Sequence, residues 1–594
     1  MEECSIIENL TVAEALAVTL REWGIESVFG VSGANIEDFH DAIHRHGGRQ
    51  LRSVAARSEI GAAFMADAQA RSGAPLGVCC STSGGGMMNL AVGVAESFQE
   101  GIPVLAIVGQ VSQGLNGVGG FQDSSGIGHT VDAEKLWTAI SKATKVINSA
   151  ERFWDDLREV VSAALSPRRG PGVLLVPKDL FQAIVPPRPL NWPRRLADVY
   201  EPVLPTSSQV RALEDALVAA SHPVLIVGPG VRAGAARDLV VEFARRVDLP
   251  VATSLSDVAC FPNDDPLFLG VVGAAGHPSV HRYINETADL VVVLGSHLEV
   301  MQRAAIGPGL ERANLVFIND ELGLSRNTFR SAEFIEVDIN GFFEAVLKGP
   351  LMLQLFRGRP AGYRHLAYIP RLAEPVPADE VLPAEECLLQ SEAIARIQED
   401  LADYGRLVFD AGNCAASALH YLTPHENLET SIALGMGGMG YAIPAAVGAS
   451  MNDGEFRRTM VICGDGAFLM QGMEVHTAVE QELPILFVVF NNAKHGMCVT
   501  RQQVYFDGRI ECASYAEPSI AQISRGFGAS DALWVGRAGT LVELDAAFDA
   551  LSCWDWAGPA VLELTLRREE VPPFAPFLPA DAPQGHSRAA LVNS

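Results

Sequence analysis

The sequence predicts an α/β protein of three domains, each built on a doubly wound parallel sheet. Length is the first reason, because 594 residues exceed what one hydrophobic core organises and correspond to about three or four domains. The second reason is that apolar, strand-like runs alternate with helical stretches in three successive blocks of the chain. Such alternation is typical of parallel sheets covered by helices.

The first block covers residues 1–185. Thr11–Trp23 has the pattern of an amphipathic helix, and Thr11 is its candidate N-cap because Glu14 follows three residues later. A linker rich in Pro and Arg follows the block at 186–205. Short apolar runs within the block are predicted to be buried strands: 27–29, 77–81, 104–108 and 173–177.

The second block covers residues 203–348 and contains strand-like runs at 223–228 and 290–295. The segment 349–385 is rich in Pro, Leu and Arg, and we expect an exposed connector there. The third block covers 386–570. We assign no structure to the tail, 571–594, which is rich in Pro and Ala.

The composition is that of a globular protein, with 48% hydrophobic and 19% charged residues. A net charge of -27 argues against binding to nucleic acids or anionic membranes through general electrostatics. The cysteines form no Cys-x-x-Cys, and Cys79 and Cys80 lie in an apolar run, so we expect buried thiols. The first residues lack a signal-peptide core, and no apolar run reaches about 18 residues. We therefore expect a cytoplasmic protein without a transmembrane helix.

Two short polar motifs stand out in the third block. Gly464-Asp465-Gly466 follows a strand-like run at 459–463, and Asn491-Asn492 follows another at 484–490, with a helical segment at 467–482 between them. This order predicts a βαβ unit with neighbouring parallel strands, so Asp465 and Asn492 would lie at the same sheet edge. One carboxylate and one amide oxygen suit Mg²⁺, which commonly keeps oxygen ligands from a diphosphate.

The segment GDGAFLMQGMEVHTAVEQELPILFVVFNN resembles the diphosphate-binding motif of thiamine-diphosphate enzymes. The resemblance extends over nearly the whole chain to about residue 570, and implies that the three blocks are pyrimidine-binding, central and diphosphate-binding domains. It also implies that Mg²⁺ is bound by the side chains of Asp465 and Asn492 and by the carbonyl of Lys494. The expected cofactor contacts nearby are Gly464, Gly466, Ala467, His495 and Met497.

Thiamine chemistry requires a carboxylic acid that stabilises the imino tautomer of the cofactor's aminopyrimidine. The segment Ala56–Ala66 resembles the family segment that carries this acid, and Glu59 is the matching residue. The alternative is an ordinary acidic residue in a first helical turn, paired with Arg57. The family's usual His next to it is Ser58 in this chain.

Four further loops resemble cofactor-binding loops of the family. The turn that ends at Gly33 is an expected cofactor contact, and the Gly-rich loop that leads to Asn89 resembles the family loop near the pyrimidine ring. A loop after the strand at 406–409 matches a diphosphate loop, with contacts from Gly412 and Asn413. The fourth loop contains Gly437 and Met439, and Met439 matches the apolar residue that supports the bent cofactor; the alternative for it is a core Met.

The substrate side resembles acetolactate synthase and sulfoacetaldehyde acetyltransferase. Gly120-Phe121-Gln122-Asp123 is similar to a Phe-Gln-Glu segment that lines such sites, and the His-His pair of pyruvate decarboxylases is missing near it. We therefore expect Phe121 and Gln122 to line the catalytic site. Arg501 takes the place of an acceptor-pocket Trp and could clamp an anionic acceptor; a solvated surface Arg is the alternative.

The expected reaction is decarboxylation of a pyruvate-like 2-oxo acid and addition of the acyl carbanion to a carbonyl acceptor. Specialised metabolism fits this reaction as well as branched-chain synthesis does. The alternatives within the family are a non-oxidative 2-oxo acid decarboxylase and a phosphate-dependent acetyltransferase. A non-catalytic relative would not need Glu59, Asp465 and Asn492 together. A nicotinamide or flavin oxidoreductase would need a Gly-x-Gly-x-x-Gly fingerprint after a strand, with an acidic residue beyond it, and we find none in a convincing context in this sequence.

The resemblance also bears on subunits and on a flavin. It implies a homodimer in which Glu59 of one subunit meets Asp465 of the other, and a homotetramer is compatible with it. Gly228-Pro229-Gly230 is similar to the flavin-contacting turn of acetolactate synthase, but the family's Met-His pair is Ala274-Ala275 and a nearby Arg is His297. FAD therefore stays open.

Overall fold

The computed structural model describes residues 9–231, 235–349, 387–451, 457–567 and 570–577. Nearly all of the connector expected at 349–385 lies outside these residues. The chain forms two compact units. Unit 1 comprises residues 1–201, 433–455 and 473–483, and unit 2 comprises 202–432, 456–472 and 484–594.

Unit 1 is built on a six-stranded parallel sheet with the order β2-β1-β3-β4-β6-β5. Its strands are β1 (Ser27–Gly30), β2 (Arg52–Ala55), β3 (Gly77–Ser81), β4 (Val104–Gln110), β5 (Ala143–Val146) and β6 (Gly172–Pro177). The helices are α1 (Val12–Glu22), α2 (Glu37–His46), α3 (Glu59–Arg71), α4 (Gly85–Glu100), α5 (Ala133–Thr138), α6 (Phe153–Leu165), α7 (Lys178–Phe181), α18 (Ala442–Ser450) and α20 (Val475–Glu480).

Helix α1 begins as the sequence predicts. The Thr11 hydroxyl accepts from the Glu14 backbone N–H, and the Glu14 carboxylate accepts from the Thr11 N–H at 2.8 Å, which completes a capping box. Cys79 and Cys80 are fully buried free thiols, also as expected.

The segment predicted as a linker packs into the core of unit 1. Trp192 is 7% exposed, and its ring lies 6.0 Å from that of Trp23 and 4.8 Å from that of Trp154. The Trp23 indole N–H also donates to the Pro193 carbonyl at 3.1 Å. Aromatic burial of this extent explains why a Pro-rich stretch is held against the domain.

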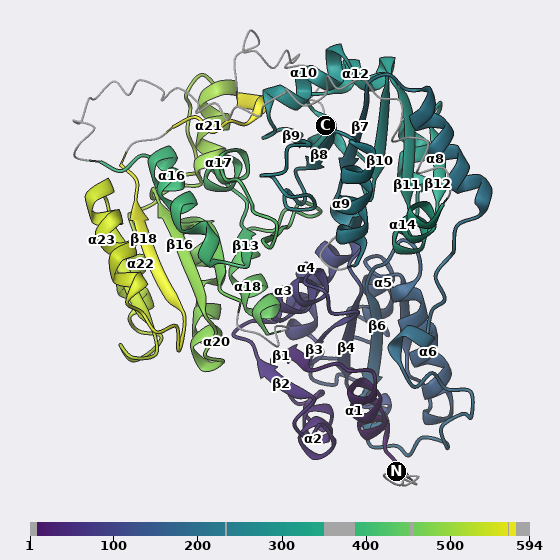
Figure 1. The fold of residues 1–594 in the computed structure, drawn as a ribbon. Helices are drawn as coiled ribbons and strands as arrows, with labels where there is room; N and C mark the ends of the chain where they lie inside the picture. Colours follow the sequence, from purple (N-terminus) through teal and green to yellow (C-terminus); the bar gives the residue numbers. More distant parts are fainter. Residues whose placement is uncertain (1–8, 232–234, 350–386, 452–456, 568–569, 578–594) are drawn as a thin grey trace. The chain divides into compact units, whose positions relative to one another are not determined.

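Helices α3 and α18 pack side by side in unit 1 (Figure 1). Their contact depends on small residues, because a Cβ added at Gly448 would lie 2.0 Å from the Met65 carbonyl oxygen. At the start of α18, the Tyr441 ring meets Phe64 edge-on with centroids 5.2 Å apart, and its hydroxyl donates to Asp67. Segments almost 400 residues apart in the chain are thus joined in one core.

Unit 2 contains two six-stranded parallel sheets. The first has the order β12-β11-β10-β7-β8-β9, with β7 (Pro223–Val227), β8 (Val251–Ser254), β9 (Phe268–Val272), β10 (Leu290–Leu294), β11 (Asn314–Asn319) and β12 (Glu333–Glu336). Its larger helices are α8 (Ser207–Ala219), α9 (Ala235–Val247), α10 (Pro278–Glu286) and α14 (Ile339–Lys348).

The second sheet of unit 2 has the order β14-β13-β15-β16-β18-β17. Its strands are β13 (Arg406–Phe409), β14 (Glu429–Ile432), β15 (Thr459–Gly464), β16 (Ile485–Asn491), β17 (Trp534–Ala538) and β18 (Ala560–Thr565). The helices are α16 (Gln390–Asp400), α17 (Asn413–Tyr421), α19 (Asp465–Gln471), α21 (Gly496–Tyr505), α22 (Ile520–Ser524) and α23 (Leu541–Ser552). In Figure 1 this sheet runs from green to yellow, with α22 and α23 beside β17 and β18.

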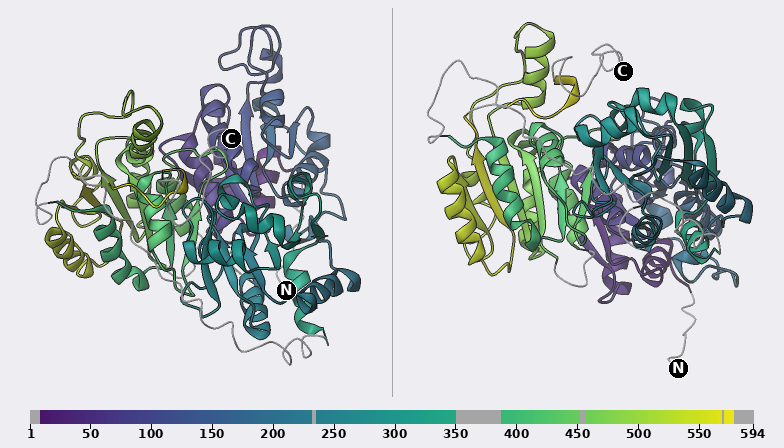
Figure 2. Two further views of the ribbon diagram at one scale, coloured as in Figure 1. Left: turned by 90° about the horizontal axis from the view of Figure 1, so that it is seen from above. Right: turned by 45° about the horizontal axis from the view of Figure 1, so that its top comes forward.

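The predicted fold class is confirmed: three parallel sheets can be followed separately in Figures 1 and 2, each flanked by helices. The segment 467–482 differs from the single helix expected, because α19 gives way to a 3-10 turn at Gly472–Glu474 before α20 begins. Gly472 stands at the break, and Gly is a poor residue for a helix interior. Within the described residues, no helix is long and apolar enough to cross a bilayer.

Candidate functional site

Glu59 is the first residue of α3, directly after the N-cap Ser58. The Ser58 hydroxyl accepts from the Gly61 N–H at 2.9 Å, which fixes the start of the helix. Asn89, on α4, donates its amide Nδ2 to Glu59 Oε2 at 3.0 Å. A Cβ at Gly86 would lie 2.9 Å from Glu59 Oε1, so the half-buried carboxylate is closely held against the beginning of α4.

Arg57 is not the ion-pair partner of Glu59 in this structure. Its guanidinium pairs instead with Glu480 of α20 at 2.6 Å. The alternative of an ordinary Arg57–Glu59 helix-start pair is therefore not what the structure contains. The Glu59 carboxylate thus has the Asn89 amide as its polar neighbour, and the residue is partly exposed to solvent.

A second carboxylate, Glu474, holds the backbone at the start of α3. Its Oε1 accepts from the backbone N–H groups of Arg57 and Ser58 at 2.9 and 3.0 Å, and its Oε2 accepts from the Thr477 hydroxyl at 2.7 Å. Glu474 is 1% exposed, and burial raises its pKa although these hydrogen bonds lower it. The helix that presents Glu59 is thus anchored through α20.

The loop with the predicted substrate residues approaches the Gly-rich loop at the end of β3. Gln122 has a φ of 64°, which is uncommon for a residue with a side chain, and a Cβ at Gly84 would lie 2.9 Å from its Cγ. Strained backbone of this kind is concentrated at functional sites. Phe121, next to it, is 85% exposed. A Cβ at Gly33 would touch Thr82, which places the Gly33 turn against the same loop.

The loop 434–440 of unit 1 contains Gly437 and Met439. Its backbone is held by Glu96 of α4, which accepts from the N–H groups of Gly435 and Met436 at 3.0 and 2.7 Å. Glu96 is 1% exposed and burial raises its pKa. Met439 is only partly buried, unlike the core Met that was the alternative.

In unit 2, Asp465 and Asn492 follow two adjacent strands. β15 and β16 are parallel neighbours with Gly464 opposite Phe490, so the strand ends meet as the sequence predicts. Asp465 is 1% exposed, and burial raises the pKa of its carboxyl despite the lowering by Tyr515 and by the backbone of Gly466 and Ala493.

Several polar atoms around Asp465 are buried and have no hydrogen-bond partner among the described residues: Asp465 Oδ2, Asn413 Oδ1 and His495 Nδ1. Tyr515 is close enough to Asp465 for burial and this carboxylate to raise its pKa. Buried polar atoms normally have partners. The free oxygens of a carboxylate and an amide therefore fit a hard cation such as Mg²⁺.

The turn after β16 brings the other predicted ligands close. A Cβ at Gly496 would lie 3.0 Å from the Asn492 amide nitrogen and 3.2 Å from that of Asn413. The Lys494 N–H donates to Asn492 Oδ1 at 3.2 Å, and Ala493 between them has a φ of 55°. The Asn492 and Asn413 amides therefore lie close to Gly496, and the turn folds back on the Asn492 side chain.

Two helices begin at the same part of unit 2. Gly412 is the N-cap of α17, with a φ of 151°, and Asn413 is its first residue. His495 is the N-cap of α21, which continues through Met497 to the exposed Arg501. Free N–H groups at helix starts favour anions such as a diphosphate. The predicted residues Gly464, Gly466 and Ala467 lie at the neighbouring start of α19.

The structure therefore assembles the predicted residues in two sets, each within one unit. Unit 1 holds Glu59, Asn89, Gly33, Gln122 and the loop with Met439, and unit 2 holds the Asp465 and Asn492 set. Among the described residues there is no group of three or more His, Cys, Asp or Glu placed to bind a metal. The predicted ligand set is of another kind, one carboxylate, one amide and one backbone carbonyl.

Sequence reasoning missed Tyr515 and the supporting carboxylates Glu474, Glu96 and Glu563. For Glu563 a signal existed, because it is a single charged residue inside the apolar run of β18. Glu474 and Glu96 lie in helical segments where an acidic residue is ordinary. Tyr515 lies in an irregular segment without any pattern.

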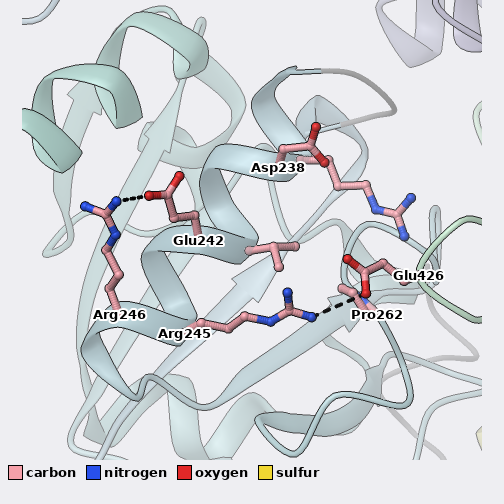
Figure 3. A pocket seen from close by; sticks show the side chains of 8 residues that line it. Asp238, Glu242, Arg245, Arg246, Pro262 and Glu426 are labelled. Atoms are coloured by element: carbon pink, nitrogen blue, oxygen red, sulfur yellow. Dashed lines mark hydrogen bonds and ion pairs between the residues drawn. The ribbon is translucent and has the colours of Figure 1, made fainter.

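A cavity of about 540 Å³ elsewhere in unit 2 contains none of the predicted residues (Figure 3). It lies beside α9, and four of its charged side chains form two pairs: Arg246 with Glu242, and Arg245 with Glu426. Arg245 also pairs with Asp265 at 2.7 Å. Arg237 and Asp238 also line the cavity, and Arg237 Nη2 is buried without a hydrogen-bond partner among the described residues.

The turn Gly228-Pro229-Gly230, which is similar to a flavin-contacting turn, forms backbone hydrogen bonds within its own domain. The Gly228 N–H donates to the Leu294 carbonyl and the Gly230 N–H to the Gly295 carbonyl, both at 2.8 Å. The Val231 N–H donates back to Gly228. Backbone donors of this turn are thus engaged within the protein, and the residues at Ala274 and Ala275 are small and buried.

Comparison with known proteins agrees with this architecture. Residues 10–129 match the N-terminal TPP binding domain of thiamine pyrophosphate enzymes, 210–342 match the central domain, and 410–564 match the C-terminal TPP binding domain. The chain is 26% identical over 599 residues to the acetolactate synthase isozyme 1 large subunit of Escherichia coli, with 96% of this chain and 97% of the relative covered. It is 27% identical over 573 residues to the acetolactate synthase large subunit of Parasynechococcus marenigrum, with 95% and 88% covered.

Proposed function

This chain belongs to the thiamine pyrophosphate enzymes, and we propose that it is a carboligase of the acetolactate synthase type. It would decarboxylate a pyruvate-like 2-oxo acid and add the acyl group to a carbonyl acceptor. The observation that carries the proposal is the pairing of Glu59 with Asn89 in a domain of this family, together with the unpartnered Asp465 and Asn413 oxygens in another. A specialised pathway is as compatible with these sites as branched-chain synthesis.

We assign the cofactor to the two sets of residues. In unit 2, Asp465, Asn492 and the Lys494 carbonyl would hold Mg²⁺, while contacts to the diphosphate would come from Gly412, Asn413, Gly464, Gly466, Ala467, His495 and Met497. Gly33, Asn89, Gly437 and Met439 of unit 1 would contact the two rings. Thiamine diphosphate, when bound, supplies the electron sink that decarboxylation of a 2-oxo acid requires.

Glu59 would exchange a proton with the pyrimidine ring, and the Asn89 amide keeps its carboxyl group in place. Gln122, held in a left-handed backbone conformation, would present its side chain to the substrate, and Phe121 would cover it. Arg501 would bind the charged group of an anionic acceptor. Each role follows from the chemistry of the side chain and its place in the set.

We further propose a homodimer, and a homotetramer is compatible with the same contacts. Helix α4 exposes Met88 (46%) and Val92 (44%) one turn apart, next to Asn89. In unit 2, α19 exposes Leu469 and Met470, each 50%, four and five residues after Asp465. Apolar side chains beside both sets are what a second copy would cover. Such a dimer would also bury the open edge of Glu59. A cytoplasmic location belongs to the same proposal.

The test is turnover of pyruvate with Mg²⁺, thiamine diphosphate and a panel of aldehydes and oxo acids, read by mass spectrometry. Acetolactate, acetoin or a mixed adduct supports a carboligase. Acetaldehyde alone would identify a decarboxylase, and acetyl phosphate formed with inorganic phosphate would identify an acetyltransferase. An absorption spectrum of the purified protein decides separately whether FAD is bound.

Glu59→Gln is the variant that tests the catalytic assignment. It keeps the size of the side chain and a hydrogen-bonding atom for Asn89 but loses the ionisable proton. Turnover should fall to the background level while binding of thiamine diphosphate changes little. Near-normal activity of this variant would refute the role of Glu59.

A further inference from the structure

We infer that Glu563, acting through Asn491, is a positioning residue for the magnesium-binding turn. The inference rests on the proposed function, since it concerns how the turn with Asn492 and Lys494 is held. Asn491 is the first residue of the Asn-Asn motif, and the second is the expected ligand. The structure assigns the first a different role.

Glu563 is a carboxylate with no exposed surface in the middle of β18. Its Oε1 accepts from the Asn491 amide Nδ2 at 2.6 Å, and its Oε2 accepts from the Ala521 N–H at 2.8 Å. Arg537 of β17 lies next to it, with Nε 3.8 Å from Oε1. A buried charge is costly unless it is paired and hydrogen-bonded, and these partners meet that requirement.

The side chain of Asn491 is fixed at both ends. Its Nδ2 donates to Glu563 and also to the Pro518 carbonyl at 2.8 Å, and its Oδ1 accepts from the Ala493 N–H at 3.3 Å. Asn491 is 1% exposed. Because Nδ2 has two acceptors, the orientation of the amide is settled, and Oδ1 must face the turn.

The contact with Ala493 matters because that residue has a φ of 55°, in the left-handed region. A residue with a side chain occupies this region only when its surroundings stabilise it. Ala493 separates Asn492 from Lys494, so its conformation decides where the Asn492 side chain and the Lys494 carbonyl point. The chain of contacts therefore runs from Glu563 to Asn491, to Ala493, and to both expected ligands.

Residues that orient metal ligands typically change metal affinity by about 10–100-fold when they are replaced. We expect Glu563→Gln and Asn491→Asp each to raise by about that factor the Mg²⁺ concentration that half-saturates binding of thiamine diphosphate. In E563Q an amide would face the Asn491 amide, and in N491D two carboxylates would face each other. The measurement is calorimetric or fluorescence titration of the cofactor at a series of Mg²⁺ concentrations, without substrate.

The double variant N491D/E563Q exchanges the amide and the carboxylate, so that the contact between the two side chains can form again. It should recover part of the Mg²⁺ affinity that each single variant loses, because a carboxylate at position 491 cannot donate to the Pro518 carbonyl as the amide does. A loss equal to the two single losses combined would overturn the inference, because independent sites add. The matched control is Glu517→Gln, which removes the exposed partner of Arg537 at 3.0 Å and leaves Asn491 untouched; its Mg²⁺ dependence should equal that of the wild type.

Thermal melting of each cofactor-free variant establishes that it is folded. Should a charged single variant fail to fold, Asn491→Ala takes its place, since it removes the contact and adds no charge. Wild-type Mg²⁺ dependence in folded N491A would overturn the inference. If the wild-type protein itself binds no thiamine diphosphate with Mg²⁺, the proposed function fails instead.

Discussion

At the scale of single residues, three carboxylates of unit 1 differ in their partners. Glu59 faces the Asn89 amide, whereas Glu474 and Glu96 accept from backbone N–H groups and are almost completely buried. Substitution of Glu59, which can meet a ligand, should change catalysis. Substitution of Glu474 should shift the start of α3, and substitution of Glu96 should shift the loop 434–440.

Glu474 should make the stability of the fold depend on pH. Burial raises its folded-state pKa above the ordinary value of 4.5, so the folded state holds the proton over a pH range where the unfolded chain has lost it. Stability from this group is therefore lost as pH rises from about 4.5 toward the raised pKa, by at most about 1.4 kcal/mol per pH unit.

Glu474→Gln removes this titration and keeps an oxygen for the Arg57 and Ser58 N–H groups. The difference in unfolding free energy between variant and wild type should shift in favour of the variant from pH 4.5 upward. Urea unfolding at several pH values measures it. A difference that does not change with pH would contradict the raised pKa.

Arg501 offers a test of the acceptor side. It is exposed on α21, and no ion pair to it occurs among the described residues. If its guanidinium clamps an anionic acceptor, Arg501→Ala should raise KM for that acceptor by about 10-fold or more, since hydrogen bonds to a charged group are worth about 1.5–3 kcal/mol. Steady-state kinetics with a neutral aldehyde is the control, for which KM should not change. Equal kinetic constants for both acceptors would identify Arg501 as a solvated surface residue.

Single residues were predictable where a motif defines them, and not where tertiary contacts do. Asp465 and Asn492 follow buried strands, so their side chains could be placed at one sheet edge from the sequence. The contact between Glu474 and Arg57 could not be predicted from the sequence, because nothing in either segment indicates that residues 417 positions apart meet. Hydrogen bonds between distant backbone and side-chain groups leave no periodic signal.

At the scale of elements, the contact between α3 and α18 depends on a glycine. Gly448→Ala would place a Cβ 2.0 Å from the Met65 carbonyl oxygen, and backbone atoms on both sides have to move. Overpacking of this kind costs about 1–3 kcal/mol. The midpoint of thermal unfolding should therefore fall clearly.

Gly114→Ala is the matched control for this variant, because a Cβ there meets nothing within 4 Å and its φ is not in the left-handed region. Its unfolding midpoint should stay close to that of the wild type. Equal midpoints for both variants would show that α3 and α18 do not pack as closely as described.

The strands were the most predictable elements. Runs such as 459–463 and 290–295 are continuously apolar, and such runs are typical of parallel strands that are buried on both faces. Helix ends were less predictable, as the break between α19 and α20 shows. The break has a function in the fold, because it turns Glu474 toward the start of α3. Its position depends on that contact, which local sequence does not reveal.

At the scale of the whole molecule, the proposed dimer makes a sharp prediction. If Glu59 of one subunit works with Asp465 of the other, a dimer of one E59Q chain and one Asp465→Asn chain retains one site with both residues. Purified through two different tags, this mixed dimer should have about half of the wild-type activity.

The control is a dimer of a wild-type chain with a chain that carries both E59Q and D465N. Each of its sites would lack one residue, so it should be inactive. Sites formed within one chain predict the opposite pattern, an inactive mixed dimer and a half-active control. The two preparations contain the same substitutions in different arrangements, and their comparison excludes general damage to the protein.

The alternation of strands and helices was sufficient to predict three parallel sheets, and family membership followed from one motif pair. The division into two compact units was not predictable. It assigns 433–455 and 473–483 to the unit of the first block, although the neighbouring strands belong to the other. Only the packing of α18 on the distant α3, and the hydrogen bonds from Arg57 and Ser58 to Glu474, reveal this.

The buried Trp192 shows that the N-terminal segment of unit 1 extends past residue 185. A fragment that stops at residue 185 would lose the ring that covers Trp23 and Trp154, and the Pro193 carbonyl that accepts from the Trp23 indole. Two indole rings would then face water, and their fluorescence would shift to the red. A fragment that continues through residue 201 keeps the three rings together. Tryptophan emission is thus a direct reading of whether the segment up to residue 201 is packed against the rest of unit 1.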